Sequence, residues 1–242
     1  MSTPAVELEQ VTLAFGRRDV LCGVDLRIER GEVVGLLGPN GVGKSTTQAL
    51  IAGWYPPTRG TVKVFGALAG SPAAAGKIGA MGPSCPLEAT RTIRAELVRH
   101  TQLLGLDPEI EIERWLDCLQ LRPLLSRRAG DVSEGERRRA ELACALLGDP
   151  PLLLLDEPMA GLDPSQVRAV QGLISGRPEG QTVILSSNRL EAINPLCDRV
   201  VVIVGGEVAV DNSPSSENDA AGLYFSAVGS LDDEQRSVGE KT

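Results

Sequence analysis

A glycine-rich segment in the first fifth of the chain has the residue types and spacing to bind phosphate. It fits the pattern GxxxxGK[ST] and consists of Gly38, Pro39, Asn40, Gly41, Val42, Gly43, Lys44 and Ser45, with Thr46 after it. Glycines let backbone N–H groups turn inward and cradle phosphate oxygens. We expect Lys44 to reach the outer phosphates of a nucleotide and the Ser45 hydroxyl to reach Mg²⁺. A chance glycine-rich turn is the plain alternative, but it is disfavoured because a strand, a loop and a helix are predicted in the required order.

A second motif, a pair of acidic residues, follows an apolar run later in the chain. Leu152–Leu155 is an unbroken leucine run that ends in Asp156 and Glu157. Beside bound phosphates, the first acid is expected near Mg²⁺, usually through water. The second, Glu157, can orient or deprotonate an attacking water. A strand followed by a solvated turn is the plain alternative, but together with the glycine-rich segment the pair predicts a catalytic site.

The elements around these motifs predict an α/β fold. Val33–Leu37 is a short apolar run fit for a buried parallel strand, and a helical stretch from Lys44 to Ala52 follows the glycine-rich turn. A strand–loop–helix order points the positive end of the helix at the same anion. Further strands are predicted at Ile78–Met81, Leu152–Leu155, Val183–Ser186, Val200–Val204 and Glu207–Val210, the last two joined by a turn at Gly205-Gly206.

Two other regions complete the predicted organisation, a P-loop NTPase core with a mostly parallel sheet. Val6–Arg30 alternates and is expected to form an N-terminal antiparallel β subdomain with a turn at Gly16–Asp19. Residues from about 85 to 147 are expected to form an inserted helical subdomain. Its apolar face would hold Ile112, Trp115, Leu116 and Leu119, and its wet side Glu111, Glu113 and Asp117.

Composition and charge exclude several classes of protein. The 242 residues are 42% hydrophobic and 23% charged, with a net charge of −8, which disfavours nucleic acid as a partner. No run approaches the roughly 18 apolar residues of a membrane span, and no signal peptide is recognisable, so we expect any membrane work to need a partner. The five cysteines are scattered and are expected to be reduced, buried thiols. The domain is expected to span residues 1–210, and residues 211–242 to form an acidic, partly disordered or loosely docked tail.

Between the two phosphate motifs, the residues from Val132 to Arg139 read VSEGERRR. This segment resembles the LSGGQ-type signature of ATP-binding cassette (ABC) ATPases, and Ala160–Asp163 looks like the D-loop of that family. The resemblance covers residues from about 5 to 210. It implies that Ser133 and Gly135 grip the γ-phosphate of an ATP bound to a second subunit. The sequence also allows a plain helix start, because Ser133 and Glu136 form a capping box.

The resemblance assigns roles to further residues, each with a structural alternative. Phe15 stands where the family places an aromatic ring that stacks on adenine, although a strand core residue would look the same. Asp163 belongs to the D-loop, but with Pro164 it also fits a helix N-cap. Arg137–Arg139 is expected to be a solvated helix face. The only histidine, His100, is expected on the surface of the helical lobe.

As an ABC ATPase, the chain is expected to bind ATP and Mg²⁺ and to pair with another ABC ATPase subunit as a homo- or heterodimer. The family also implies an integral membrane permease as partner, and the short single cassette most resembles the ATPase subunits of bacterial drug or antibiotic exporters. The expected location is the cytoplasmic, inner face of the cell membrane. The transported substrate is not readable, because substrate contacts belong to the permease.

Three departures from the family pattern predict slow hydrolysis. The family has a glutamine after the strand at Ile78–Met81, where this chain reads Gly82-Pro83-Ser84-Cys85. Asn188 stands in place of a switch histidine; its amide can donate to the γ-phosphate but cannot transfer a proton as imidazole does. Glu134 replaces a signature glycine. Because Lys44 and Glu157 are kept, we expect ATP binding with slow turnover.

Two other functions stay open on the sequence. One is an ABC ATPase without a permease, although the acidic charge disfavours a role on DNA. The other is a nucleotide-sensing subunit without meaningful turnover, which the altered switch positions keep possible. A GTPase is disfavoured, since Asn188-Arg189-Leu190-Glu191 only loosely resembles NKxD.

Overall fold

The computed structural model describes residues 3–83, 86–187, 190–214 and 220–228. The smaller of its two sheets is antiparallel and has the strand order β2-β1-β4-β5. Its strands are β1 (Val6–Phe15), β2 (Arg18–Ile28), β4 (Arg59–Val64) and β5 (Ala67–Leu68). The N-terminal antiparallel β layer predicted from the alternating sequence is therefore present, with its turn at residues 16–17.

The larger sheet has the strand order β10-β9-β3-β8-β7-β6. Its strands are β3 (Val33–Leu37), β6 (Ile78–Met81), β7 (Leu152–Asp156), β8 (Thr182–Ser186), β9 (Arg199–Val204) and β10 (Glu207–Asn212). Every neighbouring pair is parallel except β9 and β10, which close the sheet as an antiparallel pair. The carboxyl ends of the parallel strands therefore meet at one edge, where the polar motifs follow β3 and β7.

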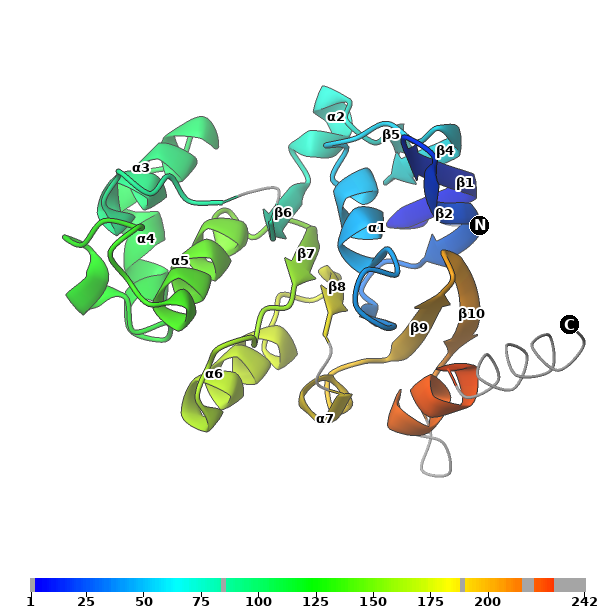
Figure 1. The fold of residues 1–242 in the computed structure, drawn as a ribbon. Coiled ribbons are helices and arrows are strands. Elements are labelled where there is room, and N and C mark those ends of the chain that lie inside the picture. Colours follow the sequence, from blue (N-terminus) through cyan, green and yellow to red (C-terminus); the bar gives the residue numbers. More distant parts are fainter. Residues whose placement is uncertain (1–2, 84–85, 188–189, 215–219, 229–242) are drawn as a thin grey trace, which may run out of the picture.

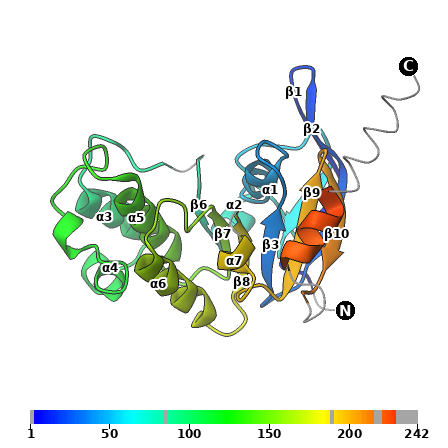
Figure 2. The ribbon, with the colours of Figure 1, turned by 60° about the horizontal axis from the view of Figure 1, so that its bottom comes forward.

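Helices cover both faces of the larger sheet, as Figures 1 and 2 show. The helices are α1 (Lys44–Ile51), α2 (Pro72–Ala75), α3 (Ile93–Leu103), α4 (Pro108–Leu116), a 3₁₀ turn at Arg122–Leu124, α5 (Glu134–Leu146), α6 (Pro164–Ser175) and α7 (Leu190–Ile193). Helices α3, α4 and α5 form a lobe to one side, and their chain lies between β6 and β7 (Figure 1). The mixed α/β fold predicted from the sequence is confirmed.

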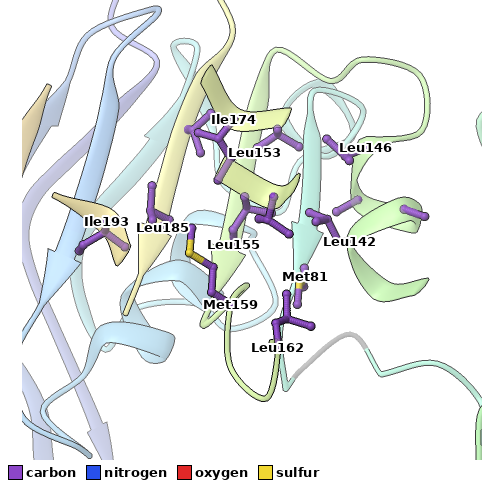
Figure 3. Packing of buried hydrophobic residues seen from close by; sticks show 14 of the residues in the cluster. Met81, Leu142, Leu146, Leu153, Leu155, Met159, Leu162, Ile174, Leu185 and Ile193 are labelled. Carbon is purple, nitrogen blue, oxygen red and sulfur yellow. The ribbon is translucent and has the colours of Figure 1, made fainter. Parts of the chain in front are cut away.

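Two apolar clusters hold the layers together. One lies between the sheets and joins the inner face of β1, β2 and β4 to Leu50 and Ile51 of α1. The other lies on the opposite face of the larger sheet, where Leu153 and Leu155 of β7 pack against α5 and α6 (Figure 3). Alternate leucines of β7 thus point into different clusters, which explains why this strand is apolar throughout.

Three charged side chains correct the expectations for the helical lobe. Glu111 is buried rather than wet, because its carboxylate accepts from the backbone N–H of Gly148 at 2.9 Å and pairs with Arg114 at 2.8 Å. Arg139 is also buried, and its Nε donates to the carbonyl oxygen of Leu119 at 3.0 Å. Arg138 is half-buried, so Arg137–Arg139 is not the solvated face that the sequence suggested.

The thiols and the histidine also differ from expectation. No disulfide joins Cys22, Cys118, Cys144 or Cys197. Cys118 is exposed and the other three are half-buried, whereas buried thiols were expected. Cys85 lies outside the described residues. His100 is half-buried, with Nδ1 2.9 Å from the carbonyl oxygen of Glu96.

Residues 220–228 form a helix that packs on the body of the protein, beside β9 and β10 (Figures 1 and 2). Ala220, Leu223 and Ala227 are buried in the same cluster as β7. The backbone N–H of Ala220 donates to the side-chain oxygen of Asn194 at 3.1 Å. Of the described residues after 210, residues 211 and 212 thus end β10 and residues 220–228 form this packed helix. None of the helices in the described part of the chain has the length and apolar character that a membrane span requires.

Candidate functional site

The glycine-rich loop lies between the end of β3 and the start of α1, where two glycines are sterically required. Gly38 has φ 148°, and a Cβ on it would lie 2.3 Å from the carbonyl oxygen of Ile203 in β9. Gly43, the N-cap of α1, has φ 117°, and a Cβ there would lie 2.7 Å from a Leu21 methyl group. The loop can follow this path only without side chains at both positions.

Lys44 is buried and points back into the loop. Its Nζ donates to the carbonyl oxygens of Gly38 at 2.7 Å and Pro39 at 3.1 Å. Because an ammonium has three N–H donors, it can hold the loop with two and still offer one to an anion. Burial lowers the pKa of Lys44, and the charges of Glu157 and Asp156 partly offset that shift.

The acidic pair lies at the end of β7, next to the end of β8. Asp156 is buried and pairs in register with Ser186 of β8. The Ser186 hydroxyl donates to Oδ1 of Asp156 and accepts from the backbone N–H of Glu157 at 3.0 Å. Glu157 has φ 52°, the left-handed region that non-glycine residues rarely adopt. Ser186 therefore fixes both acids, a role that sequence reasoning missed. The sequence predicts both strands, but the contact between their last residues follows only from the strand order, which places β7 beside β8.

A cavity of about 200 Å³ brings together most of the predicted phosphate and metal residues, while Gly38, Pro39 and Val42 do not line it. It is lined by Asn40, Gly41, Gly43, Lys44, Ser45, Thr46, Asp156 and Glu157. The backbone N–H groups at the start of α1 and the Lys44 ammonium suit phosphate oxygens. The Ser45 hydroxyl and the Asp156 carboxylate are the hard oxygen donors that Mg²⁺ prefers. The residues present therefore fit a magnesium nucleotide.

Phe15 lies outside the lining of this cavity, at the end of β1. Its side chain is 52% exposed, which contradicts the alternative that it is a strand core residue. The ring meets Tyr55 edge to face, with centroids 6.0 Å apart. An exposed, oriented aromatic ring is available for stacking on a base. Tyr55 was not predicted as part of the site.

The signature-like segment and the segment 160–163 pack against each other. Ser133 caps α5: its backbone N–H donates to the Glu136 carboxylate at 2.7 Å, and its Oγ accepts from the backbone N–H of Glu136 at 3.3 Å. A Cβ on Gly135 would lie 2.8 Å from the carbonyl oxygen of Gly161. Gly135 thus has a packing reason within this chain. Asp163 caps α6, with Oδ1 accepting from the backbone N–H of Ser165 at 2.8 Å.

Ser133, Gly135 and Asp163 do not line the described cavity of their own chain. Arg138 links the two regions instead, because its Nη1 donates to the carbonyl oxygen of Asp156 at 3.1 Å. The same guanidinium lies 3.8 Å from the carboxylate of Glu134, whose side chain is largely exposed. Asn188, Ser84 and Cys85 fall outside the described residues. Gly82 is described, and a Cβ on it would lie 3.1 Å from Cβ of Asp156.

The glycine loop lies between β3 and α1, and the acidic pair lies at the end of β7, two strands away in the same sheet. This arrangement defines a P-loop nucleotide-binding domain. Comparison with known families gives the particular family. Residues 21–160 match the family described as ABC transporter, and the chain belongs to it. The ATP-binding proteins of this family are ATPases.

Curated relatives include the "Nod factor export ATP-binding protein I" of Sinorhizobium fredii (strain NBRC 101917 / NGR234), 36% identical over 219 residues. That alignment covers 88% of this chain, which spans only 64% of the length of the relative. The protein of the same name from Rhizobium etli (strain ATCC 51251 / DSM 11541 / JCM 21823 / NBRC 15573 / CFN 42) is 33% identical over 220 residues, covering 88% of this chain and 70% of the relative.

Solved structures show the same fold. An ATP-binding subunit of an ABC transporter superposes with a TM-score of 0.78 at 29% identity, covering 86% of this chain and 90% of its own. A bacterial Atm1-family ABC exporter with ATP bound gives a TM-score of 0.77 at 23% identity, covering 87% of this chain and 39% of its own. The second likeness concerns the fold alone.

Proposed function

We propose that this chain is the subunit that binds and hydrolyses ATP to energise a membrane ABC transporter, namely an exporter. The observation that carries the proposal is the single cavity lined by the glycine-rich loop, Lys44, Ser45 and the Asp156–Glu157 pair. The direction of transport is supported by the names of the curated relatives, which are export ATP-binding proteins.

The loop and α1 bind the phosphates of ATP. Backbone N–H groups of the loop face the phosphate oxygens, and the positive end of α1 adds to the attraction. Lys44 keeps its bonds to the loop carbonyls and donates to the outer phosphates. The incoming negative charge also favours the protonated form of a lysine whose pKa burial has lowered. Phe15, oriented by Tyr55, stacks on the adenine ring.

Ser45 and Asp156 would hold Mg²⁺, Asp156 through water. When bound, the cation neutralises negative charge on the phosphates. Ser186 keeps the Asp156 carboxylate in place through the hydrogen bond to Oδ1. Glu157 orients the attacking water and accepts its proton on a carboxylate oxygen. The bond from its backbone N–H to Ser186 fixes the strained backbone from which the Glu157 side chain projects.

Two copies, or this chain and a related ATPase subunit, form the complete site. Ser133 and Gly135 begin α5 and pack on residues 160–163, so this joint surface can meet the phosphates of a partner subunit as one unit. The proposal explains why these residues do not line the described cavity of their own chain. The dimer would work on an integral membrane permease at the cytoplasmic face of the membrane.

We propose further that turnover is slow. Pro83 supplies no side-chain amide at the end of β6, and Asn188 cannot shuttle a proton. Loss of one polar transition-state contact costs about 10²–10³ in rate in other enzymes. Asn188→His is expected to raise the ATPase rate of the purified protein. Equal rates for the two proteins would contradict slow turnover through Asn188.

The nucleotide site itself is tested by calorimetry with ATP, alone and with Mg²⁺. The native chain is expected to bind and Lys44→Ala to bind at least about 100-fold more weakly, since the charge that meets the phosphates is lost. Arg17→Ala, on the turn between β1 and β2, serves as a control for loss of an exposed basic residue. No binding by the native chain would refute the proposal.

The permease is tested by purification from detergent-solubilised membranes of the native host. Recovery with a multi-span protein supports the transporter. Recovery from the soluble fraction alone favours an ABC ATPase without a permease. Glu157→Gln distinguishes a transporter ATPase from a nucleotide sensor. The change is expected to abolish transport if ATP hydrolysis drives transport, and to leave the function of a sensor intact.

A further inference from the structure

The peptide unit between Asp156 and Glu157 is held by two other elements of the fold. Its N–H, on Glu157, donates to the carbonyl oxygen of Ser186 at 3.2 Å and to the Ser186 hydroxyl at 3.0 Å. Its carbonyl oxygen, on Asp156, accepts from Nη1 of Arg138 at 3.1 Å. The N–H and the C=O of a trans peptide point in opposite directions. Strand β8 and helix α5 therefore hold this unit at opposite edges.

This peptide unit sets the direction in which the Glu157 side chain leaves the backbone. Glu157 has φ 52°, and a non-glycine residue keeps such a conformation only where its surroundings fix it. Glu157 lines the nucleotide cavity. A small rotation of the peptide unit would therefore displace the Glu157 carboxylate relative to bound phosphates.

Arg138 has the chemistry to hold a carbonyl oxygen firmly. A guanidinium stays protonated in proteins, and a hydrogen bond from a charged donor is stronger than a neutral one. The Arg138 side chain is 19% exposed, so water competes little for this bond. Its Nη2 also lies 3.8 Å from the carboxylate of Glu134, which is 62% exposed. Exposed ion pairs contribute little, so the bond to the Asp156 carbonyl oxygen is the contact that matters.

We propose that Arg138 is a positioning residue for ATP hydrolysis: it holds the peptide unit of Glu157 so that the carboxylate stays aligned with the attacking water. This inference rests on the proposed function, in which Glu157 orients that water. Arg138 does not line the nucleotide cavity, so it acts on the reaction through Glu157. It thereby joins α5, which begins in the signature-like segment, to the catalytic acid of the same chain.

The test measures single-turnover hydrolysis of ATP with Mg²⁺ by the purified full chain, and ATP binding by calorimetry. Arg138→Met keeps an unbranched side chain and removes the guanidinium. We expect the hydrolysis rate constant to fall by about 10- to 100-fold, because the carboxylate loses its alignment. The dissociation constant for ATP should change by less than about 2-fold, because the residues that meet the phosphates are intact. Arg138→Lys keeps a charged donor, and its rate should lie between the two.

The neighbouring arginine of α5 provides a matched control. Arg137 has a side chain that is 47% exposed and lies 3.7 Å from the carboxylate of Glu141, an ion pair within α5 itself. Arg137→Met thus removes a guanidinium and an ion pair like that of Arg138 with Glu134. It is expected to leave the hydrolysis rate constant unchanged.

Combination with Glu157→Gln separates a positioning role from a merely structural one. If Arg138 acts through the Glu157 carboxylate, Arg138→Met should lower the residual rate of Glu157→Gln by less than about 2-fold. A full further loss in that background would overturn the role of Arg138. So would native rates in Arg138→Met, or an equal loss in Arg137→Met.

A second variant covers the case in which Arg138→Met does not fold. Arg138→Gln then takes its place under the same criteria, because its polar end suits a half-buried position and its shorter side chain ends before the carbonyl oxygen. Failure of the native chain to bind ATP refutes the proposed function instead. Binding without any hydrolysis by the native chain refutes the hydrolytic step, and the role of Arg138 with it.

Discussion

At the scale of single residues, Ser186 is hydrogen-bonded to both members of the acidic pair. It is fully buried, donates to Asp156 and accepts from the backbone N–H of Glu157. One hydroxyl thus satisfies a buried charge and holds a residue in the left-handed region. Because both partners stay behind when the hydroxyl is removed, its loss costs more than one average hydrogen bond.

We therefore expect Ser186→Ala to lower the free energy of unfolding by about 2 kcal/mol, measured by urea denaturation. Ser165→Ala is the matched control, because its hydroxyl also donates to a carboxylate, Asp163, at 2.7 Å but on the exposed surface. That change is expected to cost less than about 0.5 kcal/mol. Equal losses in the two variants would show that Ser186 does not brace the acids.

Only some of the residues in the candidate site could be assigned from the sequence alone. The phosphate loop and Asp156–Glu157 were predicted because short-range order, strand then loop then helix, determines them. Ser186 and Arg138 were missed because their partners lie 30 and 18 residues away in the chain, respectively. Contacts of this kind depend on strand order and on the position of a helix over the sheet, which no local pattern encodes.

At the scale of elements, α5 combines a cap at its start with buried charge along its length. Glu141 is 9% exposed and lies 3.7 Å from Arg137. Burial raises the pKa of Glu141, and the neighbouring Arg138 and Arg137 only partly oppose that shift. A raised pKa means that the folded state binds the proton more tightly than the unfolded state. The stabilisation is therefore present below the unfolded pKa and is lost as pH rises through the folded pKa.

Glu141→Gln removes this dependence. We expect the variant to gain stability relative to the native chain as pH rises from about 4 to about 8, because the native chain then buries a charge that the amide lacks. Urea midpoints across this range check the trend. Glu109→Gln, at an exposed position of α4, is the control and is expected to show no such trend. A constant difference between Glu141→Gln and the native chain would contradict the argument.

Helix periodicity predicted the apolar face of the lobe but misplaced several charges. Glu111 fell on the polar side of its own helix, yet the loop at Gly148 covers it and supplies a backbone donor. Arg139 was counted as solvated, yet its long side chain crosses to the carbonyl oxygen of Leu119. A single-helix pattern cannot include groups from other elements, and buried charges are acceptable only where such groups exist.

At the scale of the whole molecule, the helix at residues 220–228 completes the main apolar cluster. Its buried positions Ala220, Leu223 and Ala227 follow helical spacing, but two of the three are alanines, and so the sequence signal was weak. We expect Leu223→Ala to cost about 2–4 kcal/mol of unfolding free energy. Phe225→Ala, at a side chain that is 65% exposed, is expected to cost less than about 1 kcal/mol. The reverse order would show that the helix does not dock.

At the same scale, the proposed permease must meet one particular face of the chain. A mostly apolar cavity of about 440 Å³ lies where the end of α1, β6, the end of α3 and α5 meet. Three exposed apolar side chains lie at its edge: Trp54, Leu103 and Leu104. Contiguous apolar surface of this kind commonly marks a site of protein association. An apolar segment of the proposed permease would suit it in chemistry.

We expect Leu104→Glu to weaken recovery with the permease by about 10-fold or more, because a carboxylate would be buried without a partner in the joined complex. ATP binding by the isolated chain should stay unchanged, since Leu104 does not line the nucleotide cavity. Leu68→Glu, at a leucine that is 59% exposed on β5, adds the same charge elsewhere and should leave recovery intact. Normal recovery of Leu104→Glu with the permease would indicate that the permease binds another face. Equal loss of recovery in both variants would indicate a general effect of charge.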